Sequence, residues 1–424
     1  MFDPALPIAL LFYGYIAVAA SKDALGVEGS SVTVIYNLVI LVWAILCRGN
    51  LGNFKICLLD ALVLALIILI ALPHIGANGS YDNLTASARI FLGYFLARSL
   101  DSTEIPRFLR YCFVLGLGTL AICLLQMPAT LLHWQTEFSR PQISGDTANP
   151  VIFGFFISLF AIQTVAIMES RSRTRLQRLW CILLVITSVF ILSVFGGKTN
   201  LISVCLVGLG SVIMCPWFSI KRRMLWTSMF ILTVAMIIAV APKNIVAFYD
   251  LVNVAEVVEA TECPLNSIVI DPLNREISQS DIGVDPNNTA AVRVVLLRIG
   301  FNLFCENVLF GYGPMLNMNP HSATAQILFE YGVLAFVVFI TIGVAVIYKL
   351  SRCSVDVNGK IRGDSWIVLL LFIDLLIYNE ILGSATNLLQ HFMLVGAAVA
   401  LTVENRLQTQ SRQADRYLTT NPPL

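Results

Sequence analysis

Five basic residues stand beside apolar segments of this chain, where a charged side chain is costly unless an anion or water meets it. A charge near the centre of a membrane costs about 2.5–3.5 kcal/mol on insertion scales. Arginine donates paired hydrogen bonds to phosphate oxygens, so cations gathered at one membrane surface would form a receptor for phosphate or pyrophosphate. The simpler alternative is that each of them extends to lipid phosphates or solvent. The five are Arg89, Arg140, Lys198, Arg293 and Arg298.

One histidine is placed where it could act with such a receptor. His321 follows Gly311-Tyr312-Gly313-Pro314 and an Asn-rich stretch, and an apolar run begins at Ala323. A neutral imidazole near pH 7 can accept a proton from a hydroxyl nucleophile, which is general base catalysis. A histidine at a helix start also serves as a cap or a packing residue, and the sequence leaves both roles open for His321.

These residues must be positioned by membrane-spanning helices. Hydrophobic residues occupy 57% of the 424 positions and charged residues 12%, a balance far from that of a soluble domain. The apolar segments predict an all-α polytopic membrane protein with about twelve transmembrane helices. No basic region precedes the first segment, so we expect it to be retained as an anchor. The segments are 4–20, 31–47, 56–72, 85–100, 108–127, 150–168, 179–195, 200–218, 224–241, 322–348, 365–383 and 389–403.

The basic residues are divided unequally between the two sides that these segments define. Of 27 Lys and Arg, 19 fall on one side, including Arg171, Arg173, Arg175 and Arg178, and 8 fall on the other. The positive-inside rule makes the richer side cytoplasmic, and both termini share it. The five cations and His321 therefore face the other compartment. The net charge of +1 gives no general electrostatic reason to expect nucleic acid as a partner.

Four regions follow from this topology. Residues 1–241 contain nine helices, 242–321 form a large loop on the outer side, 322–403 contain the last three helices, and 404–424 are a cytoplasmic tail. Within the loop, 291–304 has the pattern of an amphipathic helix at the membrane surface. Cys263 and Cys305 lie in the same loop, as a disulfide or as two free thiols.

Several kinds of chemistry find no support in the sequence. There is no Walker-type Gly-Lys-Ser/Thr loop, so the energy for a reaction must come with the substrate. There is no Cys-x-x-Cys pair and no outer cluster of His, Asp and Glu at metal-ligand spacing, so we expect neither a metal nor a cofactor.

The outer segments resemble the O-antigen ligase and polysaccharide polymerase superfamily of bacterial inner membranes. The most specific part is His321-Ser322, nine further residues and Gly332. This is similar to the ligase pattern of His, a small polar residue, nine positions and Gly. Ala335 departs from the Gly, Thr or Tyr that the family has there.

Upstream, the helix led by Arg293 and the turn Gly311-Tyr312-Gly313 are similar to the family's arginine-led periplasmic helix and the glycine turn after it. Lys198 stands where the family has an arginine at the head of a span, and it keeps the charge but not the paired donors. Arg89 and Arg140 also fall where family members carry basic residues. The resemblance covers most of residues 85–340.

The resemblance implies a GT-C-like, metal-independent glycosyltransferase of the inner membrane. It would transfer a glycan from undecaprenyl pyrophosphate to an acceptor hydroxyl at the periplasmic surface. His321 would activate the acceptor, with Arg293 as a second catalytic residue. Arg89, Arg140, Lys198, Arg293 and Arg298 would hold the pyrophosphate and stabilise its charge as it leaves.

Three functions are compatible with these features. With lipid A–core as acceptor, the protein is an O-antigen ligase of lipopolysaccharide biosynthesis, which the His-led pattern favours. With the end of another lipid-linked glycan as acceptor, it is an O-antigen or exopolysaccharide polymerase. A lipid-linked sugar flippase or secondary transporter would instead explain Asp60, Asp374 and Glu380 near the membrane, although local pairing or a helix-end position would explain them equally.

Overall fold

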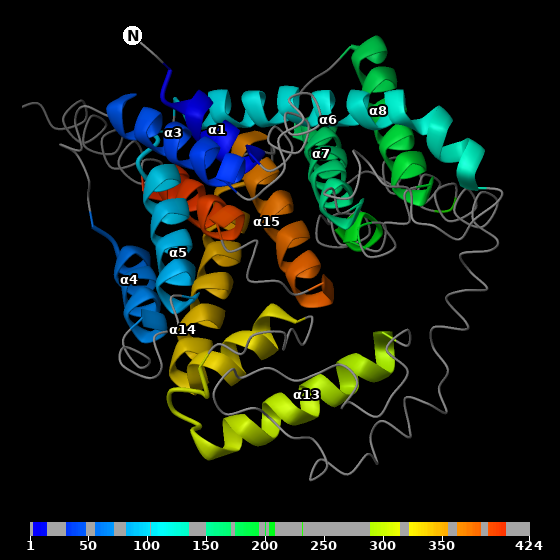
Figure 1. Cartoon of the computed structure of the whole chain (residues 1–424). Helices are drawn as coiled ribbons and strands as arrows, with labels where there is room; N and C mark the ends of the chain where they lie inside the picture. Colours follow the sequence, from blue (N-terminus) through cyan, green and yellow to red (C-terminus); the bar gives the residue numbers. More distant parts are fainter. Residues whose placement is uncertain are drawn as a thin grey trace, which may run out of the picture.

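The structure, a computed structural model, is mainly helical over the residues that it describes, and none of those residues forms a β-strand (Figure 1). The predicted all-α class is confirmed for them. They are residues 3–14, 31–47, 56–71, 82–101, 103–134, 150–170, 174–194, 200, 203–207, 231, 289–313, 322–354, 363–382 and 389–403. The helices are α1 (Ala5–Phe12), α3 (Ser31–Cys47), α4 (Leu58–Ala71), α5 (Asp82–Arg98), α6 (Ile105–Trp134), α7 (Pro150–Ser170), α8 (Arg175–Val194), α13 (Thr289–Glu306), α14 (Ala323–Cys353) and α15 (Gly363–Leu382), and a last helix runs from Leu389 to Val403.

The predicted apolar segments coincide with helices wherever the chain is described. Among the described residues, three helices are long and apolar enough to cross a membrane, namely Ile105–Leu125 within α6, Arg175–Leu192 within α8, and α14. The same part of the chain contains four shorter apolar helices, at Ile35–Cys47, Leu58–Ala71, Gly154–Glu169 and Leu389–Val403. The predicted segments 200–218 and 224–241 lie mostly outside the described residues, as does the loop 242–321 apart from 289–313.

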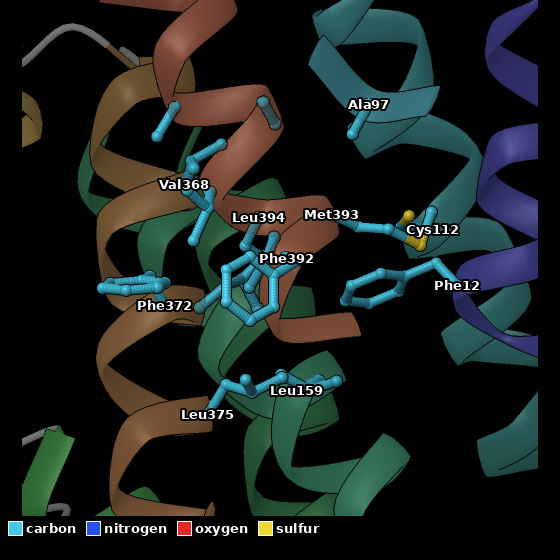
Figure 2. Close-up of a cluster of buried hydrophobic side chains, with 14 of the residues drawn as sticks. Phe12, Ala97, Cys112, Leu159, Val368, Phe372, Leu375, Phe392, Met393 and Leu394 are labelled. Atoms are coloured by element: carbon cyan, nitrogen blue, oxygen red, sulfur yellow. The ribbon is translucent and has the colours of Figure 1, made fainter. Parts of the chain in front are cut away.

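The core is built around the last helix, Leu389–Val403. Its residues from Gln390 to Thr402 are all buried, as expected of a helix that is apolar on every side. Figure 2 shows Phe392, Met393 and Leu394 of this helix among side chains of five others. Those side chains are Phe12 of α1, Ala97 of α5, Cys112 of α6, Leu159 of α7, and Val368, Phe372 and Leu375 of α15.

Large apolar side chains cover the outside of the bundle as well. Leu46 of α3 is 75% exposed and Val344 of α14 is 62% exposed, and both belong to rows of exposed apolar residues along their helices. Contiguous apolar surface of this extent would be unfavourable in water. It is what a helix presents to lipid, and it agrees with the membrane-spanning character of these helices.

The acids predicted within spans have partners on neighbouring helices. The Tyr94 hydroxyl donates to Asp60 Oδ1 at 2.6 Å. The Ser158 hydroxyl donates to Asp374 Oδ2 at 3.3 Å, and the Ser203 hydroxyl donates to Asp374 Oδ1. Such donors offset the cost of placing a carboxyl group in the interior. Local pairing therefore accounts for Asp60 and Asp374.

Polar ties also join helix ends. Each tie uses a carboxylate near the end of one helix and a nitrogen donor near the end of another. Charge-assisted bonds of this kind are the stronger class of hydrogen bond. The ties are Arg98 Nε to Asp60 Oδ1 at 3.2 Å, Arg107 Nη1 to Asp3 Oδ2 at 3.3 Å, and Trp366 Nε1 to Glu169 Oε2 at 2.7 Å.

In Figure 1, α4, α5, α14 and α15 run along one direction, whereas α13 crosses beneath their lower ends. α14 packs against α4, α13 and α15. Its first part bends away from the rest and lies beside α13 (Figure 1). This bent part and α13 carry the described portion of the candidate site.

Candidate functional site

The amphipathic helix predicted over 291–304 is present as α13, Thr289–Glu306. Its buried side chains include Val295, Ile299 and Leu303, whose spacing of four residues places them on one face. Phe301 lies on another face and is 53% exposed. The helix therefore has one packed face and one apolar exposed position, which suits a helix that lies along a membrane surface.

Aromatic rings fix α13 against the first part of α14. The Phe329 ring lies 6.5 Å from the Phe301 ring and 6.2 Å from the Phe304 ring, centroid to centroid. A Cβ added at Gly300 would stand 2.5 Å from the Phe329 ring. Gly300 thus allows the ring to lie directly on the α13 backbone. Contacts of this kind are worth about 0.5–1.5 kcal/mol beyond their buried area.

The two glycine motifs quoted above meet each other in the structure. Gly332 interrupts α14 with φ +81° and ψ 177°, and Gly311 has φ +69°. Backbone bonds join their segments: Tyr312 N donates to Phe329 O at 2.9 Å, and Val333 N donates to Val308 O at 2.9 Å. Backbone hydrogen bonds therefore hold the turn after α13 against the bend in α14. The sequence predicted a single span over 322–348, and the bend divides it at Gly332.

We expect Gly332→Ala to destabilise this junction. The added Cβ would lie 2.3 Å from Leu309 O, and a non-glycine residue at positive φ is itself strained, so the expected cost is about 1–3 kcal/mol. Thermal unfolding of the purified protein in detergent would measure it as a lower midpoint. Gly343→Ala, in the same helix, is the matched control, because a Cβ added there would meet nothing within 4 Å. Equal midpoints for the two variants would show that the bend does not need glycine.

The start of α14 is held by two side chains. Ser322 is the N-cap, with an extended backbone, and its hydroxyl oxygen accepts from Ala325 N at 3.1 Å. The same hydroxyl donates to Glu380 Oε2 at 2.8 Å. Glu380 Oε1 accepts from Thr324 N at 3.2 Å and from the Thr324 hydroxyl. Glu380 stands near the end of α15, so this cluster ties the end of α15 to the start of α14.

The structure brings Arg293 and Ser322 to the same end of the α13–α14 pair. Gly300 would meet the Phe329 ring if it carried a Cβ, and further along both segments Val333 N donates to Val308 O. The two helices therefore run in the same direction. Arg293 precedes Gly300 by seven residues, and Ser322 precedes Phe329 by seven. At 1.5 Å per helical residue, each stands about 10 Å before that contact. Both helix starts therefore lie on the side away from the bend.

Among the predicted site residues, Arg293 is a partly buried cation with an unpaired hydrogen-bond donor. Its side chain is half-buried, and its Nε atom is buried without a hydrogen-bond partner. Burial lowers the pKa of the Arg293 guanidinium from its ordinary value, because removing a cation from water disfavours its charged form. The guanidinium still keeps its charge at physiological pH. A half-buried cation with an unsatisfied donor is suited to receive an anion.

The remaining predicted residues divide into two groups. Arg298 is half-buried on α13, and Arg89 is exposed on α5. His321, Arg140 and Lys198 lie outside the described residues, although His321 directly precedes Ser322. Cys305 is exposed on α13, and Cys263 lies outside the described residues.

Comparison with known proteins adds no relative: no protein-family model matches the chain, and no curated protein does. The resemblance to the ligase and polymerase superfamily therefore rests on the residues quoted above. What the structure adds is that two of the quoted segments, the arginine-led helix with its glycine turn and the segment from Ser322 to Gly332, form one packed unit.

Sequence reasoning left one residue of this unit off the site. Glu380 was grouped with Asp60 and Asp374 as an acid near the membrane, but it bonds to the residues that follow His321. Its position close to the end of the predicted span 365–383 was the available signal, since the predicted alternation of spans assigns that end and His321 to the same side. Among the described residues, no three His, Cys, Asp or Glu side chains gather as a metal site.

Proposed function

We propose that this protein is a membrane glycan transferase that moves a glycan from undecaprenyl pyrophosphate to an acceptor hydroxyl on the periplasmic face. The observation that carries the proposal is the junction between α13 and the start of α14. It gathers Arg293, with its buried unpartnered Nε, and the segment that follows His321 at one end of two helices joined through backbone hydrogen bonds. A cation and a general base on neighbouring elements suit transfer from a pyrophosphate carrier.

The chemistry assigns a separate role to each group. The acceptor hydroxyl oxygen forms a bond to the anomeric carbon of the glycan, while the bond from that carbon to the pyrophosphate oxygen breaks. His321 takes the hydroxyl proton. Arg293 meets the charge that grows on the departing pyrophosphate, with Arg298 and the predicted contributions of Arg89, Arg140 and Lys198. The energy comes from the carrier linkage.

The proposal includes about twelve spans with both termini in the cytoplasm. The polar ties between helix ends support this arrangement. Arg98 with Asp60, Arg107 with Asp3, and Trp366 with Glu169 each join ends that the alternation of spans assigns to the cytoplasm. The tie of Glu380 to Ser322 joins two ends assigned to the periplasm. No described tie among these joins ends of opposite assignment.

An O-antigen ligase acting on lipid A–core is the form of the proposal that the His-led pattern favours, and a polymerase would use the same residues with a glycan acceptor. The acids that a transporter would explain can be accounted for without a transport role. The transporter alternative drew on Asp60, Asp374 and Glu380 as intramembrane acids, and each of them has local hydrogen-bond donors in the structure.

The experiment that tests the proposal uses the full-length protein in lipid nanodiscs. Supplied with a lipid-linked glycan and lipid A–core, it should release undecaprenyl pyrophosphate and give a longer lipopolysaccharide. Supplied with the lipid-linked glycan alone, a polymerase would elongate it. Absence of pyrophosphate release with either acceptor would reject the transferase, and movement of the donor between leaflets without release would establish a transporter.

A further inference from the structure

Glu380, near the end of α15, accepts hydrogen bonds from residues at the start of α14. Its two carboxylate oxygens accept from the Ser322 hydroxyl, the Thr324 hydroxyl and the Thr324 backbone N–H. Thr324 N is one of the backbone donors that a helix start leaves unpaired. Glu380 therefore acts as a second cap for α14, supplied by a different helix.

Helix electrostatics explain why a glutamate can do this. Glu380 lies in the last turn of α15, Gly363–Leu382, where the helix dipole disfavours a negative charge. The start of α14 carries the opposite end of a dipole and favours one. No acidic residue stands in the first turn of α14 itself. The carboxylate of α15 therefore supplies the charge that α14 lacks.

The contacts also fix the conformation of Ser322. Its hydroxyl accepts from Ala325 N at 3.1 Å and donates to Glu380 at 2.8 Å, so both of its bonding directions are used. A side chain with both bonds made is held in one rotamer, and its backbone is held with it. Because Ser322 is bonded to His321, the Cα of His321 stays within about 3.8 Å of the Cα of Ser322. Glu380 thus helps to fix the residue to which His321 is bonded.

We propose that Glu380 is a positioning residue for His321: through Ser322 and Thr324 it holds the segment that presents the general base to the acceptor. The inference rests on the proposed function, in which His321 takes the acceptor proton. It differs from a direct catalytic role, because Glu380 acts here only through the two residues that it bonds.

A double-mutant cycle separates these roles. We expect Glu380→Gln to lower kcat about 10-fold to 100-fold, the size of effect produced by a misplacement of roughly 1 Å at a catalytic group. The donor KM should stay within about twofold, because the arginines are untouched. In protein that already carries Ser322→Ala and Thr324→Ala, only the bond from the Thr324 backbone N–H to Glu380 remains, so adding Glu380→Gln should cause a much smaller further loss. Glu169→Gln is the matched control, since Glu169 bonds Trp366 far along the chain from this cluster, and it should keep wild-type kcat.

Hydrogen exchange provides a readout that does not need activity. The backbone amides of Thr324 and Ala325 are both bonded within the cluster, so Glu380→Gln should raise exchange in a peptide spanning 320–326 and leave α3 unchanged. An equal loss of kcat in both backgrounds would overturn the proposal in favour of direct contact with substrate. Unchanged exchange together with unchanged kcat would overturn the cap itself. A wild-type protein that releases no pyrophosphate, yet shows the exchange effect, would reject the proposed function and leave the cap in place.

Discussion

Replacing His321 with alanine is expected to lower glycan transfer about 10²-fold to 10⁴-fold, the range that a positioned general base contributes. The reason is that the acceptor hydroxyl would have to lose its proton to water while the anomeric bond forms. Release of undecaprenyl pyrophosphate in nanodiscs, followed with a fixed amount of acceptor, measures the loss. Donor binding should be unchanged, because the proposed pyrophosphate site does not include His321.

Folding must be separated from chemistry in that variant. Ser322 caps α14 through its own hydroxyl and the Glu380 carboxylate, so loss of the His321 imidazole leaves the described bonds of the cap intact. The thermal midpoint of His321→Ala should therefore match that of the wild type. Wild-type transfer in a correctly folded His321→Ala protein would remove His321 from the mechanism and leave the acceptor to ionise by another route.

Hydropathy alone predicted the helices well because the signal for them is local. α3 occupies Ser31–Cys47, the same residues as the predicted segment, and α13 extends the predicted 291–304 by two residues at each end. In each case, a run of apolar or amphipathic residues long enough for the membrane or its surface predicts the helix without reference to any tertiary contact. Helix ends such as that of α6, which continues from the predicted residue 127 to Trp134, are less well determined.

The candidate site could be predicted only in its parts. The sequence singled out Arg293, His321 and Gly332, but the bend at Gly332 depends on Leu309, whose carbonyl oxygen occupies the space of a side chain there. The partner of Ser322 is Glu380, 58 residues away. Pairings at such separations follow from how α13, α14 and α15 pack, and no periodicity within one segment encodes them.

Arg293, near the start of α13, is expected to contribute to binding of the lipid-linked donor as well as to stabilising the charge on the departing pyrophosphate. Arg293→Ala is expected to lower kcat/KM for the lipid-linked donor about 10²-fold to 10³-fold, comparable to removing one donor from an oxyanion site. A half-buried guanidinium acts in a poorly hydrated place, where its attraction for pyrophosphate is stronger than at an exposed surface. Titration of donor binding to the purified protein, alongside the kinetics, divides the loss between the two steps.

Two variants make the Arg293 result specific. Arg293→Lys keeps the charge but loses the planar pair of donors, so it should recover part of the activity, with the remainder measuring the value of the paired hydrogen bonds. Arg178→Ala removes an exposed arginine of α8 and should leave donor binding as it is, because exposed charges on the predicted cytoplasmic side do not meet the substrate. If Arg293→Ala bound and used the donor as the wild type does, the unsatisfied Nε would have to be met by membrane phosphate, and the pyrophosphate would be held by other residues.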